Sequence, residues 1–244
     1  MNKPIIEIQN LYKKFGTNVV LNGFNMNLYE GENVVIMGKS GSGKSVMIKC
    51  VIGLEIADNG IIKVMDKNIS QLDPIQWNEL RTEVGFLFQG SALYDSMSVR
   101  ENLEFPLRRH TKKFGHIDDA TPMVVEALEN VGLAKAIDLM PSELSGGMKR
   151  RIALARTLIL QPKIILYDEP TTGLDPITSK EIIALIKSIQ NKYKTSSIII
   201  THDVDCARVI ADRMILLIDG VNYAEGTFDE LSASQDEKVQ AFFK

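Results

Sequence analysis

Residues 34–45 read VVIMGKSGSGKS, and this stretch decides the fold class. Its first four residues are all apolar, without the alternation of a half-exposed strand, which predicts a strand buried on both faces of a parallel sheet. Residues 38–45 match the pattern G-x-x-x-x-G-K-S/T, in which a glycine-rich loop joins such a strand to the start of a helix. The stretch therefore predicts an α/β protein with a phosphate-binding loop.

The chemistry of this loop follows from its residue types. Glycines let successive backbone N–H groups turn inward around phosphate oxygens, and the helix N-terminus adds about half a positive charge. Lys44 is expected to neutralise charge on the β- and γ-phosphates, and the Ser45 hydroxyl is expected to ligate Mg²⁺. The residues that we expect to bind nucleotide in this stretch are Gly38, Lys39, Ser40, Gly41, Ser42, Gly43, Lys44, Ser45 and Val46.

Two later apolar runs end in polar residues that can do chemistry. Residues 164–167 (IILY) are followed by Asp168 and Glu169, and residues 198–200 (III) are followed closely by His202. In open α/β sheets ligands bind at the carboxyl ends of the strands, so we expect these strand ends to meet at the phosphate loop. Asp168 is expected to be a second Mg²⁺ ligand and Glu169 to orient the attacking water and take its proton. His202 is expected to bond the γ-phosphate and to hold Glu169.

Gln89 follows another strand-like run, residues 84–88 (VGFLF), just before the pattern becomes helical. We expect its side-chain amide to touch Mg²⁺ or the attacking water while it joins two lobes. A polar residue that merely ends a strand is the alternative interpretation of this position.

The sequence from about residue 90 to residue 160 has a helical pattern, which predicts a helical lobe inserted into the α/β core. Within it, Ser98 and Glu101 fit a capping box. Thr121 before Pro122 fits an N-cap followed by proline at the first helical position.

A second candidate phosphate site lies in this helical lobe. Ser145, Gly146 and Gly147 directly precede a strong helix, so Ser145 can cap it and the glycines leave its N–H groups accessible to an anion. A single γ-phosphate held by both loops requires closure of the lobes or a second copy of the protein. The charge run Lys149-Arg150-Arg151 is expected to form a solvated helix face.

Composition excludes several classes of function. The 244 residues carry 28 Lys and Arg against 31 Asp and Glu, and this net charge of −3 argues against a partner that is nucleic acid. The two cysteines, Cys50 and Cys206, form no CxxC motif, so a disulfide framework or structural zinc is not expected. The longest apolar stretches, such as residues 214–218, are far shorter than the ~20 residues of a membrane span. Any work at a membrane is therefore expected at its surface.

Taken in order, these motifs resemble the ATPase domain of ABC transporters over essentially the whole chain. The match looks like the family's Walker A loop (38–45), Q-loop (Gln89), LSGG signature (145–147), Walker B strand (164–169) and switch histidine (His202). The resemblance implies a single ATP-binding domain over residues 1–244. Its fold would be a P-loop NTPase with a RecA-like parallel sheet core, an N-terminal antiparallel β lobe and the inserted helical lobe. It would be an ATPase that works with ATP and Mg²⁺.

The same resemblance implies a homodimer in which two copies enclose two ATP molecules head to tail. Ser145, Gly146 and Gly147 of one copy would then complete the nucleotide site of the other. Phe15 matches the aromatic residue that stacks on adenine in this family, and Tyr12 is the weaker candidate for that role.

A narrower resemblance concerns the region around Gln89. Residues 88–99 (FQGSALYDSMSV), with LSGGMKRR at 144–151, are similar to ATPases of Mce-associated, Mla-type lipid transporters. This resemblance implies phospholipid transport between membranes from the cytoplasmic face of the inner membrane, where the chain would be peripheral. It also implies an integral membrane permease, an Mce-domain lipid-binding protein and a small regulatory subunit as partners. Another ABC system, such as a solute importer or lipoprotein exporter, and a soluble ATPase of iron–sulfur assembly are the alternatives.

Overall fold

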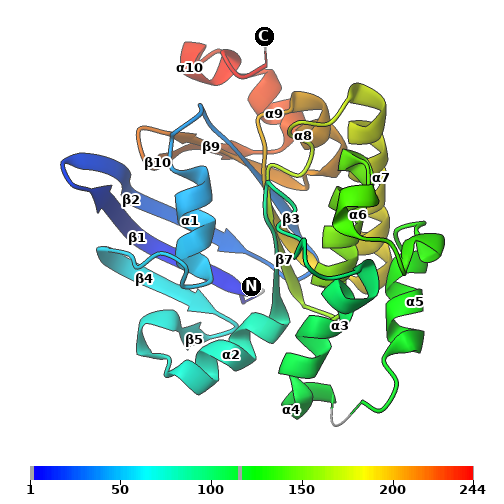
Figure 1. Cartoon of the computed structure of the whole chain (residues 1–244). Coiled ribbons are helices and arrows are strands. Elements are labelled where there is room, and N and C mark those ends of the chain that lie inside the picture. Colours follow the sequence, from blue (N-terminus) through cyan, green and yellow to red (C-terminus); the bar gives the residue numbers. More distant parts are fainter. Residues whose placement is uncertain (1–2, 115–116, 244) are drawn as a thin grey trace.

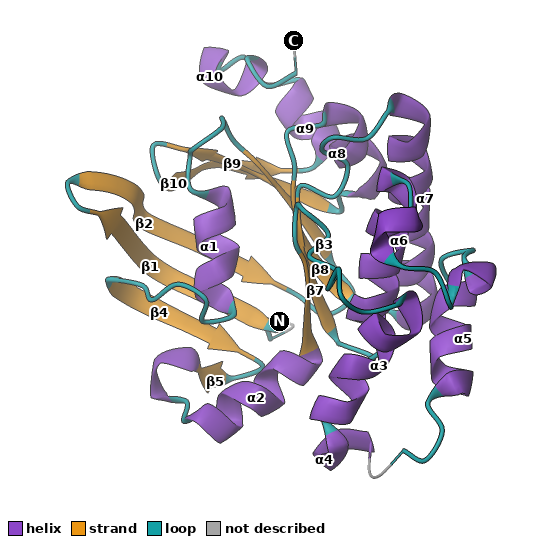
Figure 2. Ribbon diagram, in the orientation of Figure 1, coloured by secondary structure: helices purple, strands orange, loops and turns teal. Residues whose placement is uncertain are grey.

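Two β-sheets and a set of helices make up the chain, which a computed structural model describes over residues 3–114 and 117–243 (Figures 1 and 2). The antiparallel sheet has the order β2 (Asn18–Leu28), β1 (Ile6–Phe15), β4 (Asn59–Val64) and β5 (Lys67–Asn68). The second sheet has the order β10 (Val221–Gly226), β9 (Arg213–Ile218), β3 (Asn33–Met37), β8 (Ser196–Ile200), β7 (Ile164–Asp168) and β6 (Val84–Leu87). Its strands are parallel except β10, which pairs antiparallel with β9.

The helices divide into those that cover the sheets and those that form a separate lobe. The covering helices are α1 (Lys44–Val51), α2 (Pro74–Glu83), α7 (Pro176–Tyr193), α8 (Val204–Ile210), α9 (Phe228–Ser232) and α10 (Glu237–Gln240). Between β6 and β7 lie α3 (Val99–Arg109), α4 (Thr111–Phe114), α5 (Thr121–Glu129) and α6 (Gly146–Leu158). Short 3₁₀ turns occupy Ile69–Gln71, Ala134–Ala136 and Pro141–Glu143. The predicted architecture, a parallel core with an antiparallel N-terminal lobe and inserted helices, is confirmed.

The central strand β3 is buried on both faces, as its uninterrupted apolar run predicts. Val34 and Ile36 pack into the hydrophobic cluster between the two sheets, which α1 also fills. Val35 and Met37 point the other way, into the cluster covered by α6, α7 and α8. Each fully buried aliphatic side chain stabilises the fold by roughly 1.5–3 kcal/mol, so β3 is anchored from two sides.

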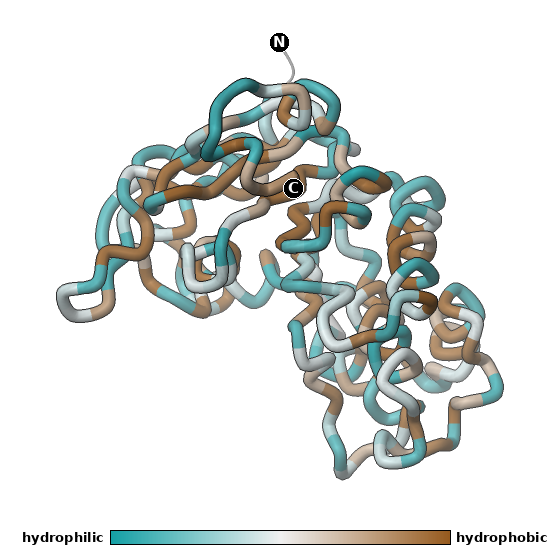
Figure 3. Tube along the Cα trace, turned by 90° about the horizontal axis from the view of Figure 1, so that it is seen from above, coloured by the Kyte–Doolittle hydropathy of each residue, from teal (hydrophilic) through white to brown (hydrophobic). Residues whose placement is uncertain are grey.

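The inserted helices have a hydrophobic core of their own, formed by buried side chains of α3, α5 and α6. Figure 3 shows this lobe as an arm that extends away from the strands. The capping box of Ser98 and Glu101 is confirmed, with hydrogen bonds in both directions. Across residues 3–114 and 117–243, no helix is both long and apolar enough to cross a membrane.

The predicted N-cap at Thr121 is wrong. Helix α5 starts with Thr121 itself, and Ala120 is the capping position, with no side-chain cap. The Thr121 hydroxyl accepts a hydrogen bond from Arg100 at 3.0 Å, and its backbone N–H donates to Asp119 Oδ1 at 2.9 Å. Arg100 and Asp119 thus bond the polar groups of Thr121, and its side chain does not cap the helix.

Asn102 is the polar centre of the segment that joins the sheet to the helical lobe. Its side chain is fully buried, accepts from Tyr94 N–H at 2.9 Å and donates to the carbonyl groups of Tyr94, Met97 and Ser98. Arg156 Nη1 also donates to its amide oxygen, at 3.3 Å. One amide thereby bonds several backbone groups of this segment, of which the Tyr94 N–H and the Met97 carbonyl lie outside any strand or helix.

Replacing Asn102 with alanine is expected to lower the free energy of unfolding by about 1–3 kcal/mol, because buried backbone groups lose their partners. For a chain of this size each kcal/mol corresponds to a fall in Tm of roughly 2–4 °C, measurable by calorimetry. Asn78→Ala, at an exposed position of α2, is the control and should leave Tm nearly unchanged. Equal Tm values for Asn102→Ala and the wild type would contradict this account.

Candidate functional site

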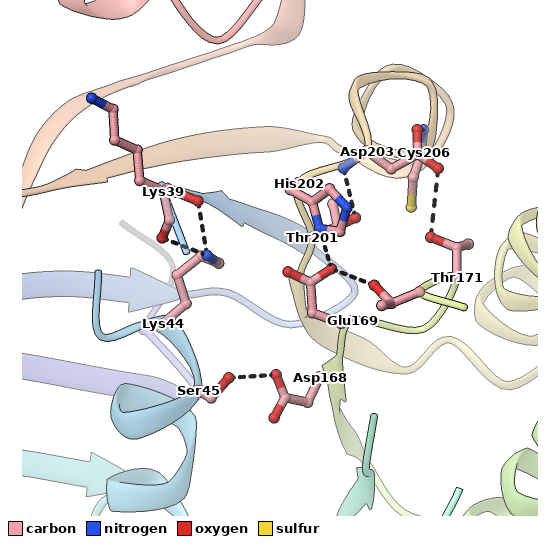
Figure 4. Close-up of polar contacts among 12 residues, drawn as sticks. Lys39, Lys44, Ser45, Asp168, Glu169, Thr171, Thr201, His202, Asp203 and Cys206 are labelled. Atoms are coloured by element: carbon pink, nitrogen blue, oxygen red, sulfur yellow. Dashed lines mark hydrogen bonds and ion pairs between the residues drawn. The ribbon is translucent and has the colours of Figure 1, made fainter. Parts of the chain in front are cut away.

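The register of the parallel sheet brings the three predicted strand ends together. Ile36 of β3 pairs with Ile200 of β8, and Ile200 pairs in turn with Asp168 of β7. The residues that follow these positions therefore emerge side by side at one edge of the sheet. Figure 4 shows the side chains of Lys44, Ser45, Asp168, Glu169 and His202 gathered there.

The glycine-rich loop bends around the side chain of Lys44. Lys44 Nζ donates to the carbonyl groups of Gly38 at 2.8 Å and Lys39 at 3.1 Å, and the residue is only 7% exposed. Burial lowers the pKa of Lys44, and the nearby carboxylates of Glu169 and Asp168 oppose that shift. The loop thus holds a partly desolvated ammonium group at the strand edge, where it is placed to bind a phosphate.

Gly43 precedes α1 in a conformation that a side chain would strain. Its φ is +100°, and a Cβ there would lie 2.7 Å from Val20 Cγ1 and 2.8 Å from the Val20 carbonyl oxygen. Only glycine therefore lets the loop close against β2 and present the first N–H groups of α1.

Ser45 and Asp168 face each other across the strand edge. Ser45 Oγ donates to Asp168 Oδ1 at 2.7 Å, and Asp168 is 5% exposed. Two oxygen ligands of this kind suit Mg²⁺, which keeps several waters and completes its shell with phosphate oxygens. In the described part of the chain, no group of three or more His, Cys, Asp or Glu side chains could hold a metal ion.

Glu169 is held by two neighbours through one of its oxygens. Its Oε2 lies 2.8 Å from His202 Nδ1 and accepts from Thr172 Oγ1 at 3.0 Å. The Glu169 side chain is 12% exposed, whereas that of His202 is 67% exposed. Glu169 also has a φ of +51°, a left-handed conformation that costs a residue with a side chain about 1–2 kcal/mol. Its backbone N–H is bonded to the Ile200 carbonyl at 2.9 Å, which fixes this turn at the end of β7.

A cavity of about 830 Å³ lies over this edge. The whole loop from Gly38 to Val46 lines it, together with Phe15, Gln89, Glu169 and His202. Phe15 is 47% exposed, so it is available to stack on a ligand. Tyr12 is not among the lining residues, and its ring lies against Gly23. The geometry therefore favours Phe15 over Tyr12 as the aromatic wall.

Ser145, Gly146 and Gly147 are not brought to this cavity within one chain. Ser145 is the N-cap of α6, and its Oγ accepts from Met148 N–H at 3.2 Å. A Cβ on Gly147 would lie 2.6 Å from Thr178 Cγ2 of α7, so the start of α6 approaches α7 more closely than a side chain allows. These three residues lie outside the lining of the cavity.

Two residues at this site are not predicted by the sequence patterns. Thr172 lines the cavity and bonds Glu169, and its signal in the sequence is only the Thr-Thr pair that follows the Asp-Glu-Pro turn. Arg150 is 4% exposed, so the expectation that the charge run 149–151 forms a solvated face is wrong at its centre. Its guanidinium reaches the carbonyl groups of Phe88 and Thr172, at 2.8 and 3.4 Å.

Comparison with known proteins places this site in a family. The model of the ABC transporter family matches residues 21–172. The chain is 40% identical to the intermembrane phospholipid transport system ATP-binding protein MlaF of Haemophilus influenzae, over all of this chain and 92% of that protein. It is 41% identical to the methionine import ATP-binding protein MetN of Clostridium tetani, over 88% of this chain and 67% of that protein.

Solved structures give the same result. A dimeric ATP-binding cassette, MJ0796, described as a post-hydrolysis state bound to ADP and Pi, has a TM-score of 0.81 and 33% identity over 91% of this chain and 98% of that one. CbiO1 from Clostridium perfringens, described as part of an ABC transporter complex, has a TM-score of 0.85 and 29% identity over 98% of this chain and 93% of that one. The chain therefore belongs to the ABC transporter family, as an ATPase that works with ATP and Mg²⁺.

Proposed function

We propose that the residues gathered at the strand edge divide the work of ATP hydrolysis among them. Lys44 neutralises charge on the β- and γ-phosphates, and the backbone N–H groups of the loop bind their oxygens. Ser45, Asp168 and Gln89 would hold the Mg²⁺ that accompanies the nucleotide, and the ion would supply positive charge to stabilise the charge that develops on the phosphates. The observation that supports this most directly is the hydrogen bond of 2.7 Å that Ser45 Oγ donates to Asp168 Oδ1.

Glu169 is proposed to orient the attacking water and to accept its proton. The bonds from His202 and Thr172 both fall on Oε2, so the carboxylate is fixed while its other oxygen, Oε1, accepts no hydrogen bond from the described residues. A fixed carboxylate with one free acceptor oxygen is what a general base requires. His202, which is mostly exposed at the cavity, is placed to contact the γ-phosphate as well.

Replacing Glu169 with glutamine is expected to keep ATP binding and to lower kcat by about 10²–10⁴-fold, because an amide cannot accept the proton. Phosphate release and nucleotide affinity, measured on the same preparation, separate the two effects. Glu129→Gln on the exposed surface of α5 is the control. Hydrolysis near the wild-type rate in Glu169→Gln would remove Glu169 from this role.

The active unit is proposed to be a homodimer in which Ser145, Gly146 and Gly147 of one copy complete the cavity of the other. The start of α6 has a capped helix N-terminus suited to a phosphate, yet it does not line the cavity of its own chain. In a dimer, the start of α6 of one copy would instead face the cavity of the other copy. The dimeric cassette among the similar structures supports a dimer for this chain.

Cysteine crosslinking tests this dimer. Burial raises the pKa of Cys50 to about 11 and that of Cys206 to about 12, so both native thiols stay protonated and unreactive near pH 7. In a Glu169→Gln background, Ser40→Cys combined with Ser145→Cys is expected to give a covalent dimer with a short bismaleimide, only when ATP and Mg²⁺ are present. Each single cysteine variant serves as a control. A crosslink confined to one chain, or none with ATP, would count against the proposed dimer.

The transport system is proposed to be one that moves phospholipid between membranes. The observation that carries this proposal is the MlaF alignment, which spans all of this chain and nearly all of that protein. The chain would then bind an integral permease at the cytoplasmic face of the inner membrane, with an Mce-domain protein and a small regulatory subunit in the same complex. Solute import is the second candidate, because MetN is as similar in identity over a shorter alignment.

Affinity purification from detergent-solubilised membranes distinguishes the two candidates. We expect a tagged Glu169→Gln variant to bind ATP without hydrolysing it, and we expect mass spectrometry to find a permease, an Mce-domain protein and co-purified phospholipid with it. Untagged cells processed in parallel give the background. Recovery of a permease with a solute-binding protein, and without an Mce-domain protein, would favour solute import.

A further inference from the structure

Arg150 occupies an unusual place for a residue in a basic run. It lies one turn into α6 and is 4% exposed. Its Nη1 donates to the Phe88 carbonyl at 2.8 Å, and its Nη2 donates to the Thr172 carbonyl at 3.4 Å. One guanidinium therefore joins three segments: the start of α6, the end of the strand that leads to Gln89, and the turn that follows Glu169.

This burial is energetically unfavourable for the side chain itself. Arg150 forms no ion pair with a carboxylate of the described residues, and its Nε is buried without a hydrogen-bond partner among them. Burial lowers the pKa of its guanidinium, with no neighbouring charge to oppose the shift. An apolar side chain of similar length would fill the same space without desolvating a charge. Packing alone therefore does not account for an arginine at this position.

The segments that Arg150 contacts explain why an arginine is present at this position. Phe88 directly precedes Gln89, which lines the nucleotide cavity. The Thr172 hydroxyl bonds Glu169 Oε2, the same oxygen that contacts His202. Ser145, Gly146 and Gly147 lie three to five residues before Arg150, at the start of α6. The planar, rigid fork of a guanidinium can hold two carbonyl groups at a set separation, whereas a flexible ammonium group cannot.

We propose that Arg150 is a positioning residue for ATP hydrolysis: it sets where the start of α6 lies relative to Gln89 and, through Thr172, relative to Glu169. The inference rests on the proposed roles of Glu169 and of Ser145, Gly146 and Gly147. Arg150 is not among the residues that line the nucleotide cavity. Its loss displaces groups that do line it.

Arg150→Met tests the proposal, because methionine keeps the length of the stem and removes both hydrogen bonds. We expect kcat to fall by about ten-fold or more while KM for ATP changes by less than about two-fold, with a Tm equal to or above that of the wild type. Arg81→Met is the matched control: Arg81 also donates to two backbone carbonyls, those of Ile52 and Gly53, and none of these three residues lines the nucleotide cavity. Its kcat should stay within about two-fold of the wild type. A wild-type kcat in folded Arg150→Met, or an equal loss in Arg81→Met, would overturn the proposal.

Arg150→Lys covers the case in which Arg150→Met fails to fold. Lysine keeps the charge but not the fork, so kcat is expected to stay at least about three-fold below the wild type at an unchanged Tm. Full activity of this variant would contradict a requirement for both bonds.

A double-mutant cycle shows whether Arg150 acts through Thr172. Thr172→Val removes the hydroxyl that bonds Glu169 and keeps the backbone carbonyl that Arg150 contacts. If both residues serve the position of Glu169, the double variant is about as slow as the slower single variant. A rate reduced by the product of the two single losses would show independent action and refute the route through Thr172.

Glu169→Gln, assayed in parallel, separates failure of this inference from failure of the proposed mechanism. Hydrolysis at the wild-type rate in Glu169→Gln would refute the general base and, with it, the route through Thr172. Loss of hydrolysis in Glu169→Gln together with a wild-type rate in Arg150→Met would refute the positioning role alone.

Discussion

The pairing of three parallel strands is the constraint on which the site depends. Because Ile36 and Asp168 both pair with Ile200, the chain leaves β3, β8 and β7 at the same level of the sheet. A shift of one residue in either pairing would turn alternate side chains to the opposite face, which the two apolar clusters around β3 do not permit. Hydrophobic burial thus fixes the register, and the register places the polar residues. The distance between Ser45 and Asp168 is therefore a consequence of how the apolar side chains of the strands pack in the core.

Features that depend on one stretch of chain could be predicted from the sequence. The phosphate loop, the buried strand before it and the polar residues after β7 and β8 are local patterns, and the order of parallel strands with intervening helices restricts how they can meet. The positive φ of Glu169 could not be predicted, because this turn is fixed by the bond that the Glu169 N–H donates to the Ile200 carbonyl of β8. The resemblance to the family already favoured Phe15 over Tyr12, and the position of the cavity relative to β1 supports the same order.

The two errors of the sequence analysis have the same physical origin. An arginine in a basic run is solvated in most helices, and a threonine before a proline caps most helices that begin there. At Arg150 two backbone carbonyls from distant segments replace the solvent, and at Thr121 the guanidinium of Arg100 takes the hydroxyl. In each case a polar group finds a partner more than twenty residues away, which no local pattern reveals.

The unequal lengths of the two Arg150 bonds bear on how the lobes are coupled. At 2.8 Å the bond to Phe88 is close to the optimum for a charge-assisted contact, whereas the bond to Thr172 at 3.4 Å is near the limit of a hydrogen bond. Of the two contacts, the bond to the segment that carries Gln89 is therefore the stronger, and the bond to the turn that follows Glu169 is the weaker. A small displacement of α6 or of the turn after β7 would break the weaker bond first.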